Sequence, residues 1–355
     1  MNRLELVRTQ LEQEGIDALL VESQTNRRYI TNFTGTAGAA LITAREAFFV
    51  TDFRYVEQAK NQCEGFTVVQ HEDGISKEIN KLLEAENAAS VGFEKAHTTY
   101  EKYDFYQEAF AAKLVPVAGM IENLRLFKSI DELKTMQKAA EIADAAFEHI
   151  VTYIKPGVRE REIANELEFY MRHLGAESSS FDIIVASGER GARPHGVASH
   201  KQVEKGDMIT MDFGAYYEGY CSDITRTVAV GEPSDEMHHV YDTVLKAQLK
   251  SLEQIKAGMT GVEADAIARD YIYAEGYEGY FGHGLGHGLG MDVHEEPRLS
   301  PKGNLQLEAG MVVTVEPGIY LPGKGGVRIE DDILITEDGN ERLTLSEKTL
   351  KRIET

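Results

Sequence analysis

Two aspartates in one predicted β-hairpin are the first residues of this sequence whose types and spacing suggest chemistry. Strand-like runs on both sides of Glu218-Gly219 predict a two-residue turn. With that turn, Asp212 faces Thr225, and Asp212 and Asp223 become diagonal neighbours on one face of the sheet. Carboxylates this close repel each other unless a proton or a cation lies between them. The hairpin alone leaves a second interpretation open, in which both acids face solvent.

A glycine-rich segment, residues 281–295, brings together three histidines: His283, His287 and His294. Its five glycines at alternate positions disfavour a helix, since each costs about 1 kcal/mol relative to alanine. We therefore expect an extended or looped path whose backbone approaches a ligand closely. The whole chain has 11 histidines, and three in one short segment indicate a shared role rather than three separate structural ones.

Two glutamates lie at the ends of apolar, strand-like runs. Glu316 follows residues 311–315, and Glu330 follows residues 326–329. Each needs a partner, because an unpaired buried carboxylate is very costly. An ion pair with Arg328 would satisfy Glu330, but it leaves Glu316 unexplained.

These residues together supply four carboxylates and at least one imidazole. An oxygen-rich set with one nitrogen suits Mn²⁺ or a similar first-row ion better than a thiolate-type zinc site. Four negative charges match two divalent cations, and two ions about 3.5–4 Å apart can hold a bridging hydroxide and polarise a carbonyl. The pattern therefore predicts a hydrolase with two metal ions.

Three other motifs are excluded. Residues 318–325 resemble a phosphate-binding P-loop but lack its Ser/Thr, and a strand rather than a helix is predicted to follow. Residues 294–298 fail the last position of the H-E-x-x-H zinc pattern, and no G-x-S-x-G nucleophile elbow occurs.

The second part of the chain, about 126–355, is predicted to be one α+β domain that positions these residues. Ser129 and Glu132 have the spacing of a capping box that opens a helix reaching Ile154, and Gly175 is the expected stop of the next helix. Two more helices are predicted, one from about Ser234 and one over 262–275. The predicted strands cover residues 207–217, 220–230, 310–316 and 326–336.

The first part of the chain alternates helix-like and strand-like patterns, which indicates an α/β domain. Strands are expected at 17–21, 39–43 and 47–51, and the domain is expected to cover residues 1–125, with a break near 121–125. Two domains also fit the length of 355 residues, because single cores rarely grow beyond about 250–300 residues.

The composition excludes several classes of partner. A formal net charge of −22 argues against non-specific binding to nucleic acid or to an anionic membrane. Two separated cysteines, Cys63 and Cys221, make a disulfide framework unexpected and fit a reducing compartment. Neither a signal-peptide pattern nor an apolar run of about 18 residues occurs, so we expect a cytoplasmic protein with no membrane span.

The motifs resemble those of the proline-specific peptidases of the pita-bread superfamily, namely Xaa-Pro dipeptidase (prolidase) and aminopeptidase P. Creatinase and methionine aminopeptidase are more distant relatives. Residues 14–21, 29–35 and 51–55 resemble the smaller domain of that family. The resemblance implies a creatinase-like α/β domain over 1–125 and a pita-bread catalytic domain over 126–355.

The resemblance also implies a ligand set for two divalent metal ions, Mn²⁺ or Co²⁺ first, with Zn²⁺ and Fe²⁺ as alternatives. The five positions that match the family's ligands are Asp212, Asp223, His287, Glu316 and Glu330. By the same resemblance, a hydroxide that bridges the two ions attacks the carbonyl before proline, and Glu316 also serves as the proton shuttle.

The substrate-binding residues come from the resemblance as well. His195 matches a histidine that hydrogen-bonds the substrate, His294 one that steadies the scissile carbonyl, and His283 a pocket residue near the proline ring. Arg328 matches an arginine that orients the ligands. Arg298 lies where prolidases place a group for the free carboxylate of a dipeptide, and a surface ion pair is its alternative role.

The leading hypothesis is therefore a metal-dependent Xaa-Pro dipeptidase that acts on proline-containing dipeptides or short peptides. The first alternative is an aminopeptidase P that acts on longer peptides, and the second is a non-catalytic peptide-binding module. The resemblance further implies a homodimer.

Overall fold

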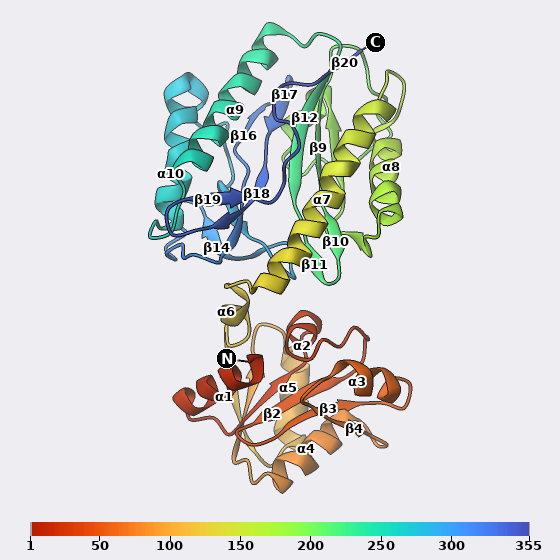
Figure 1. Ribbon diagram of the computed structural model, residues 1–355, viewed down its shortest axis with the longest axis vertical. Helices are drawn as coiled ribbons and strands as arrows, with labels where there is room; N and C mark the ends of the chain where they lie inside the picture. The colour runs from red at the N-terminus through yellow and green to blue at the C-terminus, as the bar shows by residue number, and fades with distance from the viewer. Residues whose placement is uncertain (1, 355) are drawn as a thin grey trace. The chain divides into compact units, whose positions relative to one another are not determined.

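The computed structural model describes residues 2–354, and these divide into two compact units after Arg125 (Figure 1). The first unit is built on one six-stranded mixed sheet with the order β4-β3-β2-β1-β5-β6. Its strands are β1 Ala18–Val21, β2 Ala39–Thr43, β3 Ala47–Thr51, β4 Thr67–Gln70, β5 Ser90–Glu94 and β6 Lys113–Val117. Its helices are α1 Arg3–Glu14, α2 Gln24–Thr31, α3 Val56–Gln62, α4 Ile75–Ala85, α5 Tyr100–Ala109 and α6 Glu122–Arg125.

The core of the first unit follows from strand alternation. Leu20 and Leu41, from adjacent strands, share one face with Ile79 and Leu83 of α4 and with Tyr106 of α5. Strands β1, β2 and β3 cover the three predicted strand segments, so the α/β prediction for this part of the chain is confirmed.

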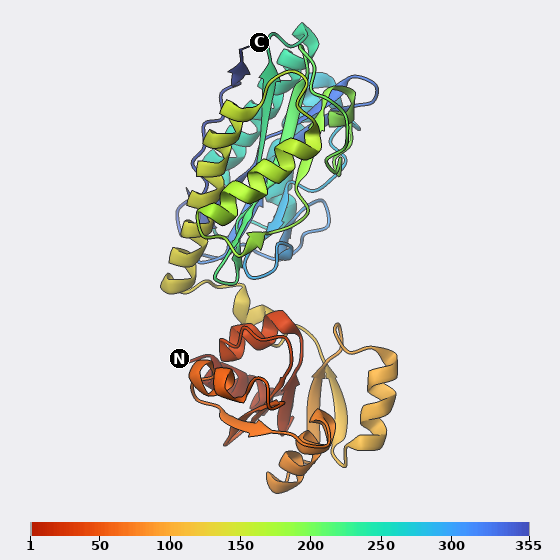
Figure 2. The same cartoon turned by 90° about the vertical axis from the view of Figure 1, so that its right-hand side faces the viewer.

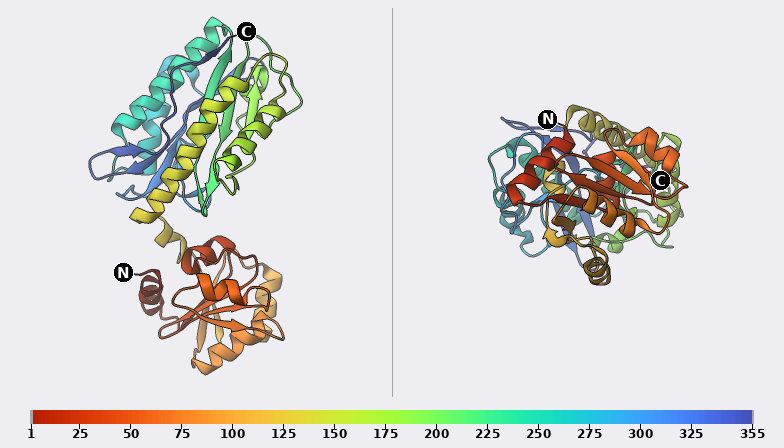
Figure 3. Two further views of the ribbon diagram at one scale, coloured as in Figure 1. Left: turned by 45° about the vertical axis from the view of Figure 1, so that its right-hand side comes forward. Right: turned by 90° about the horizontal axis from the view of Figure 1, so that it is seen from below.

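The second unit surrounds its strands with two pairs of long helices. The helices are α7 Ile130–Tyr153, α8 Glu160–His173, α9 Asp235–Gln254 and α10 Gly261–Ile272. The strands lie between the α7–α8 pair and the α9–α10 pair (Figure 3), and Figure 2 shows α7 and α8, in yellow to yellow-green, in front of the green strands. The predicted capping box of α7 is present at Ser129 and Glu132, and Ser234 caps α9 as expected.

Four sheets make up the strand layer. The four-stranded sheet has the order β20-β12-β9-β8 and the five-stranded sheet β14-β13-β15-β18-β19, beside β11-β10-β7 and the hairpin β16-β17. The strands that concern the site are β8 Ile184–Ser187, β9 Met208–Phe213, β12 Ile224–Val230, β13 Gly286–Gly288, β15 Val312–Val315, β16 Gly318–Leu321, β17 Gly325–Arg328 and β18 Asp331–Ile335. The others are β7 Ser178–Ser179, β10 Ala215–Tyr217, β11 Tyr220–Cys221, β14 Glu295–Leu299, β19 Asn340–Arg342 and β20 Arg352–Ile353.

The predicted hairpin register is confirmed, because Asp212 pairs with Thr225. Each predicted long strand, however, is broken in two. A Cβ at Gly214 would lie 1.7 Å from the carbonyl oxygen of Ser222, so the chain bends here and only glycine fits. The four-stranded sheet contains β9 and β12, and the three-stranded sheet contains β10 and β11, which lie next to the turn.

The predicted strand over 326–336 is also divided. β17 pairs with β16, whereas β18 pairs with β15 in the five-stranded sheet. Ile329 and Glu330 lie between them, and the amide of Glu330 donates to the carbonyl oxygen of Thr225 instead of continuing a ladder. The chain therefore changes sheets at Glu330.

Side-chain alternation leaves one face of each large sheet free of the helix cores. Met211 of β9 belongs to the core under α7 and α8, so Asp212 points to the opposite face. Val313 and Val315 of β15 belong to the core under α9 and α10, so Thr314 points away from it. The polar residues of the two sheets thus share the space away from both helix pairs. Within residues 2–354, no helix is long and apolar enough to cross a membrane.

Candidate metal centre

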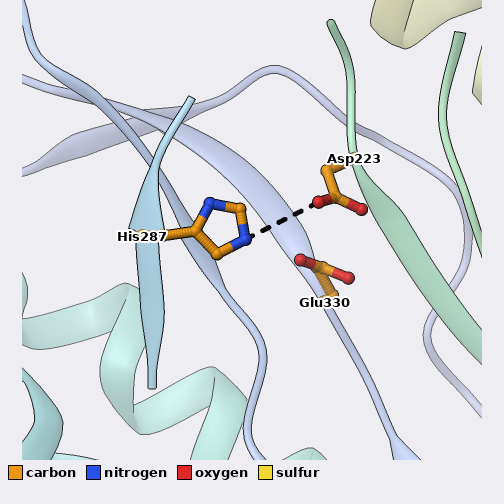
Figure 4. A group of neighbouring side chains, drawn as sticks. All are labelled: Asp223, His287 and Glu330. Carbon is orange, nitrogen blue, oxygen red and sulfur yellow. Dashed lines mark ion pairs between the residues drawn. The ribbon is translucent and has the colours of Figure 1, made fainter. Parts of the chain in front are cut away.

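Three donors from three separate chain segments converge in this space. Asp223 lies just before β12, His287 in β13, and Glu330 between β17 and β18. One ligand atom from each lies within 4.8 Å of the other two. Figure 4 shows the three side chains pointing toward one another, with His287 Nε2 3.7 Å from Asp223 Oδ2.

Glu316 extends the group. Its Oε1 lies 3.3 Å from Nε2 of His287 and accepts a hydrogen bond from the hydroxyl of Thr314 at 3.2 Å. One nitrogen of His287 therefore faces the carboxylates of both Asp223 and Glu316. This arrangement joins the two large sheets at the centre of the unit.

The protonation of His287 explains why this arrangement suits a cation. Its Nδ1 lies 3.1 Å from the carbonyl oxygen of Gly288, which can only accept, so Nδ1 carries the proton. Burial lowers the pKa of His287 to about 4, so the ring is neutral at pH 7. Its Nε2 lone pair then points at two carboxyl groups, so either a proton or a bound metal ion must lie between them.

Asp212 lies beside this group on β9. Its Oδ2 accepts a hydrogen bond from Nη2 of Arg328. Its Oδ1, like Oδ1 of Asp223, is buried without a hydrogen-bond partner in the described part of the chain. Buried acceptors are almost always paired in proteins, so these two oxygens are available to a cation.

The electrostatics of the carboxylates agree with this interpretation. Burial, and then repulsion from neighbouring acids, raises the pKa values of Asp223 and Glu330 well above their usual range. Burial raises the pKa of Glu316 to about 8, although Arg328 opposes the shift. Such raised pKa values mean that a proton or a cation must lie between these carboxyl groups, and the mixed O/N donor set fits divalent cations.

The alternative considered for Glu330, an ion pair with Arg328, is not formed among the described residues. Arg328 pairs with Asp212, and Glu330 accepts from the hydroxyl of Thr225 at 2.6 Å. The chain turns after β17, so Glu330 does not continue the strand face of Arg328. The predicted role of Arg328 in orienting a ligand stays a prediction, now directed at Asp212.

The predicted substrate-binding histidines gather around the donors. The ring of His294 lies 4.4 Å from that of His287, centroid to centroid. His195 is exposed on the segment between β8 and β9, and Nδ1 of His283 lies 4.0 Å from Oε2 of Glu316. The pKa values of His283 and His294 are both lowered, mainly by burial, with His195 as a minor cause.

Arg298 is 74% exposed, and its Nε lies 3.5 Å from Oε1 of Glu296. The surface ion pair considered as its alternative role is thus formed. Arg298 also lies opposite His287 in the β13–β14 ladder, so it borders the centre from the adjacent strand.

Two glycines of the histidine segment allow close packing of strands. A Cβ at Gly286 would lie 2.0 Å from the carbonyl oxygen of Thr314, and one at Gly288 would lie 2.1 Å from that of Glu296. These glycines let β13 approach its neighbouring strands, and the predicted approach of the backbone to a ligand stays a prediction. This close packing brings His287 to Glu316.

Two residues of the site were missed by the sequence analysis. The hydroxyl of Tyr320 lies between Nε2 of His283 and Nη1 of Arg328. The register of the β16–β17 hairpin makes Tyr320 a diagonal neighbour of Arg328, so that hairpin held a signal. Asp332, whose Oδ2 accepts from the amide of Asp223 at 2.8 Å, gave no such signal because the contact spans 109 residues.

Comparison with known proteins gives the class of this fold and site. Residues 134–337 match the model of metallopeptidase family M24, and residues 3–127 match the creatinase/prolidase N-terminal domain. The chain belongs to metallopeptidase family M24, which implies divalent metal ions and confirms the predicted two-part fold and the predicted enzyme class.

Three similar proteins match nearly the whole length of this chain. An uncharacterized peptidase, YqhT, of Bacillus subtilis is 56% identical over 98% of this chain and 99% of its own length. A solved structure described as an Xaa-Pro dipeptidase from Bacillus anthracis is 55% identical, covers 99% of both chains and has a TM-score of 0.97. A solved X-Pro aminopeptidase from Thermotoga maritima is 40% identical over 97% of this chain and 100% of that one, with a TM-score of 0.92.

Proposed function

We propose that this M24 metallopeptidase is an Xaa-Pro dipeptidase. The observation that carries the proposal is the convergence of neutral His287 with the buried carboxylates of Asp223, Glu316 and Glu330. The similarity to a solved protein described as an Xaa-Pro dipeptidase supports the choice of substrate.

The metal would be held by the four carboxylates and the imidazole predicted from the sequence. The five ligands are Asp212, Asp223, His287, Glu316 and Glu330. When bound, two divalent ions supply Lewis-acid polarisation of the scissile carbonyl and an activated water. Mn²⁺ or Co²⁺ suits this donor set, and Zn²⁺ and Fe²⁺ are the alternatives to test.

The chain's own residues would handle the substrate around that centre. His294 donates a hydrogen bond to the carbonyl oxygen as negative charge develops there. Glu316 carries a proton to the proline nitrogen as the peptide bond breaks. His195 and His283 bind the two sides of the dipeptide, and Arg298 pairs with its free carboxylate after leaving Glu296.

The test uses the full chain stripped with a chelator and reloaded with Mn²⁺ or Co²⁺. Cleavage of an Xaa-Pro dipeptide is compared with cleavage of an Xaa-Pro-Xaa tripeptide. Metal-restored cleavage mainly of the dipeptide is the expected result. No cleavage of either peptide by the metal-loaded chain would overturn the proposal.

An aminopeptidase P is the second candidate, and two observations favour it. The guanidinium of Arg298 is exposed and already paired with Glu296, and one similar structure is described as an X-Pro aminopeptidase. Preference for the tripeptide in the same assay would select this function. The homodimer and the cytoplasmic location stay predictions of the sequence analysis.

A further inference from the structure

Glu160, in the first turn of α8, is a fully buried carboxylate that the proposed mechanism does not use. Its side chain is 0% exposed. Oε1 accepts hydrogen bonds from the amide and the hydroxyl of Ser187, both at 2.8 Å. Oε2 accepts from the amide of Ser199 at 3.0 Å and from its hydroxyl at 2.6 Å, and Nε of Arg190 lies 2.9 Å from it.

These partners bracket the segment that carries His195. Ser187 is the last residue of β8, and Ser199 follows the turn that contains His195. Between them, Arg190 donates through Nη2 to the carbonyl oxygen of Val197 at 2.6 Å. The Glu160 carboxylate therefore holds both ends of residues 187–199 by hydrogen bonds. Through Arg190 it also holds Val197, within the segment.

The segment is supported from a second side by the hairpin that carries Arg328. A Cβ at Gly326 would lie 2.1 Å from the carbonyl oxygen of Gly191, so the two backbones are in close contact. Nη1 of Arg328 lies 3.4 Å from the carbonyl oxygen of Pro194. Because the His195 side chain is exposed, the backbone of this segment determines the point from which its ring can reach a substrate.

The charge on Glu160 is maintained despite its burial. Burial opposes ionisation, but the hydrogen bonds from Ser199 and Ser187 outweigh it and lower the pKa of Glu160 below its usual value. An ionised acceptor makes stronger hydrogen bonds than a neutral one. Its five donor groups are thus held by a full negative charge.

We propose that Glu160 is a positioning residue that fixes the 187–199 segment and thereby holds His195 ready for substrate. This inference rests on the proposed function, since it assigns His195 to substrate binding. A segment ordered before binding loses less conformational entropy when substrate arrives. Loss of the carboxylate therefore raises KM more than it lowers kcat.

The test is Glu160→Gln in the full metal-loaded chain, with Glu168→Gln as the matched control. Glu168 is on the same helix and forms an exposed ion pair with Arg172. Glu160→Gln is expected to raise KM for an Xaa-Pro dipeptide about tenfold, to change kcat by less than about threefold, and to leave the bound metal unchanged. Glu168→Gln is expected to match the unmodified protein.

Hydrogen exchange measured by mass spectrometry provides a readout that needs no substrate. Peptides covering 187–199 should exchange faster in Glu160→Gln, while those from β9 and β12 should not. Ser199→Ala removes one donor and is the second variant, useful if Glu160→Gln does not fold; it is expected to raise KM about threefold with faster exchange of the same peptides.

Two results would overturn the inference: unchanged exchange over 187–199 in these variants, or a loss of kcat at constant KM. The two proposals fail separately. If the unmodified protein cleaves no Xaa-Pro bond, the proposed function is wrong, while the exchange result still decides whether Glu160 fixes the segment.

Discussion

The hydroxyl of Tyr320 donates its proton to Nε2 of His283, across 2.7 Å. The direction follows from the other ring nitrogen, since Nδ1 of His283 lies 2.7 Å from the carbonyl oxygen of Gly284 and must carry the imidazole proton. Burial, with help from Arg328, lowers the pKa of His283 to about 4, so Nε2 is a bare acceptor. Nη1 of Arg328 then donates to the same hydroxyl at 2.8 Å. Both nitrogens of His283 are used, so only its ring face is available to a substrate.

Tyr320→Phe should therefore impair the enzyme without changing its shape. The substitution leaves Nε2 of His283 without its donor and leaves Nη1 of Arg328 with only the carbonyl oxygen of Pro194, at 3.4 Å, among the residues described. We expect kcat/KM for an Xaa-Pro dipeptide to fall about tenfold to hundredfold, with metal content retained. Tyr153→Phe, at an exposed position, is the control. Equal activity in both variants would show that the Tyr320 hydroxyl has no such role.

Glu316→Gln tests the proton carrier. The amide keeps the size of the side chain and an oxygen for the Thr314 hydroxyl, but it cannot carry a proton in the same way. Turnover should fall by at least about 10²-fold. Metal content, measured by elemental analysis, identifies any part of the loss that comes from weaker binding. Glu308→Gln, at an exposed position, serves for comparison, and full activity of Glu316→Gln would rule out the assigned role.

Metal removal should destabilise the protein because the buried carboxyl groups lose the cation between them and must either take up protons or repel one another. Adding Mn²⁺ to the chelator-treated chain should raise Tm. In the metal-free state, at a pH high enough to ionise these groups, Asp223→Asn should also raise Tm, by about 2–4 °C for each kcal/mol of repulsion removed. The same variant should lose the response to Mn²⁺. A metal-free Asp223→Asn protein with a lowered Tm would contradict this account.

The dependence of protein stability on pH should reveal that Glu160 is ionised in the folded protein. Its folded-state pKa is lowered from the usual 4.5, so its charge stabilises the fold above that pH, and this contribution disappears as pH falls through the folded-state value. The difference in Tm between the unmodified protein and Glu160→Gln should therefore be largest near pH 7 and shrink toward acid. Differential scanning calorimetry over this range measures it, and a difference that grows toward acid would have the wrong sign.

Arg298→Ala separates dipeptide from tripeptide recognition. If Arg298 leaves Glu296 to bind the free carboxylate next to the scissile bond, kcat/KM for the dipeptide should fall about tenfold or more. Tripeptide cleavage should change little, since its carboxylate lies one residue further on. Arg172→Ala removes another exposed, paired arginine and controls for net charge. Equal losses on both peptides would exclude carboxylate recognition.

Local sequence patterns were enough to predict the placement of the two aspartates in the candidate site. The pairing of Asp212 with Thr225 follows from one turn, Glu218-Gly219, because a hairpin register depends on neighbouring residues alone. The proximity of Glu316 to His287 was inferred only by resemblance, since the two residues are on different strands.

Long-range contacts account for what the sequence analysis missed or misassigned. The alternative partner considered for Glu330 is not found, because alternation along an assumed continuous strand places Glu330 beside Arg328, and the chain instead changes sheets between β17 and β18. Glu160 gave no signal, since its partners at Ser187 and Ser199 become neighbours only after β8 and the next segment fold against α8. Alternation and turn residues carry no information about such contacts.

The distance along the chain between the donors has a consequence for synthesis on the ribosome. Asp212 and Asp223 emerge on one hairpin, but the Asp332 carboxylate that bonds the Asp223 amide follows 109 residues later, and β20, which pairs with β12, is made later still. A growing chain therefore carries only two of the five proposed ligands until most of the catalytic unit has been translated. A chain released before Glu330 would therefore lack one of the five proposed ligands.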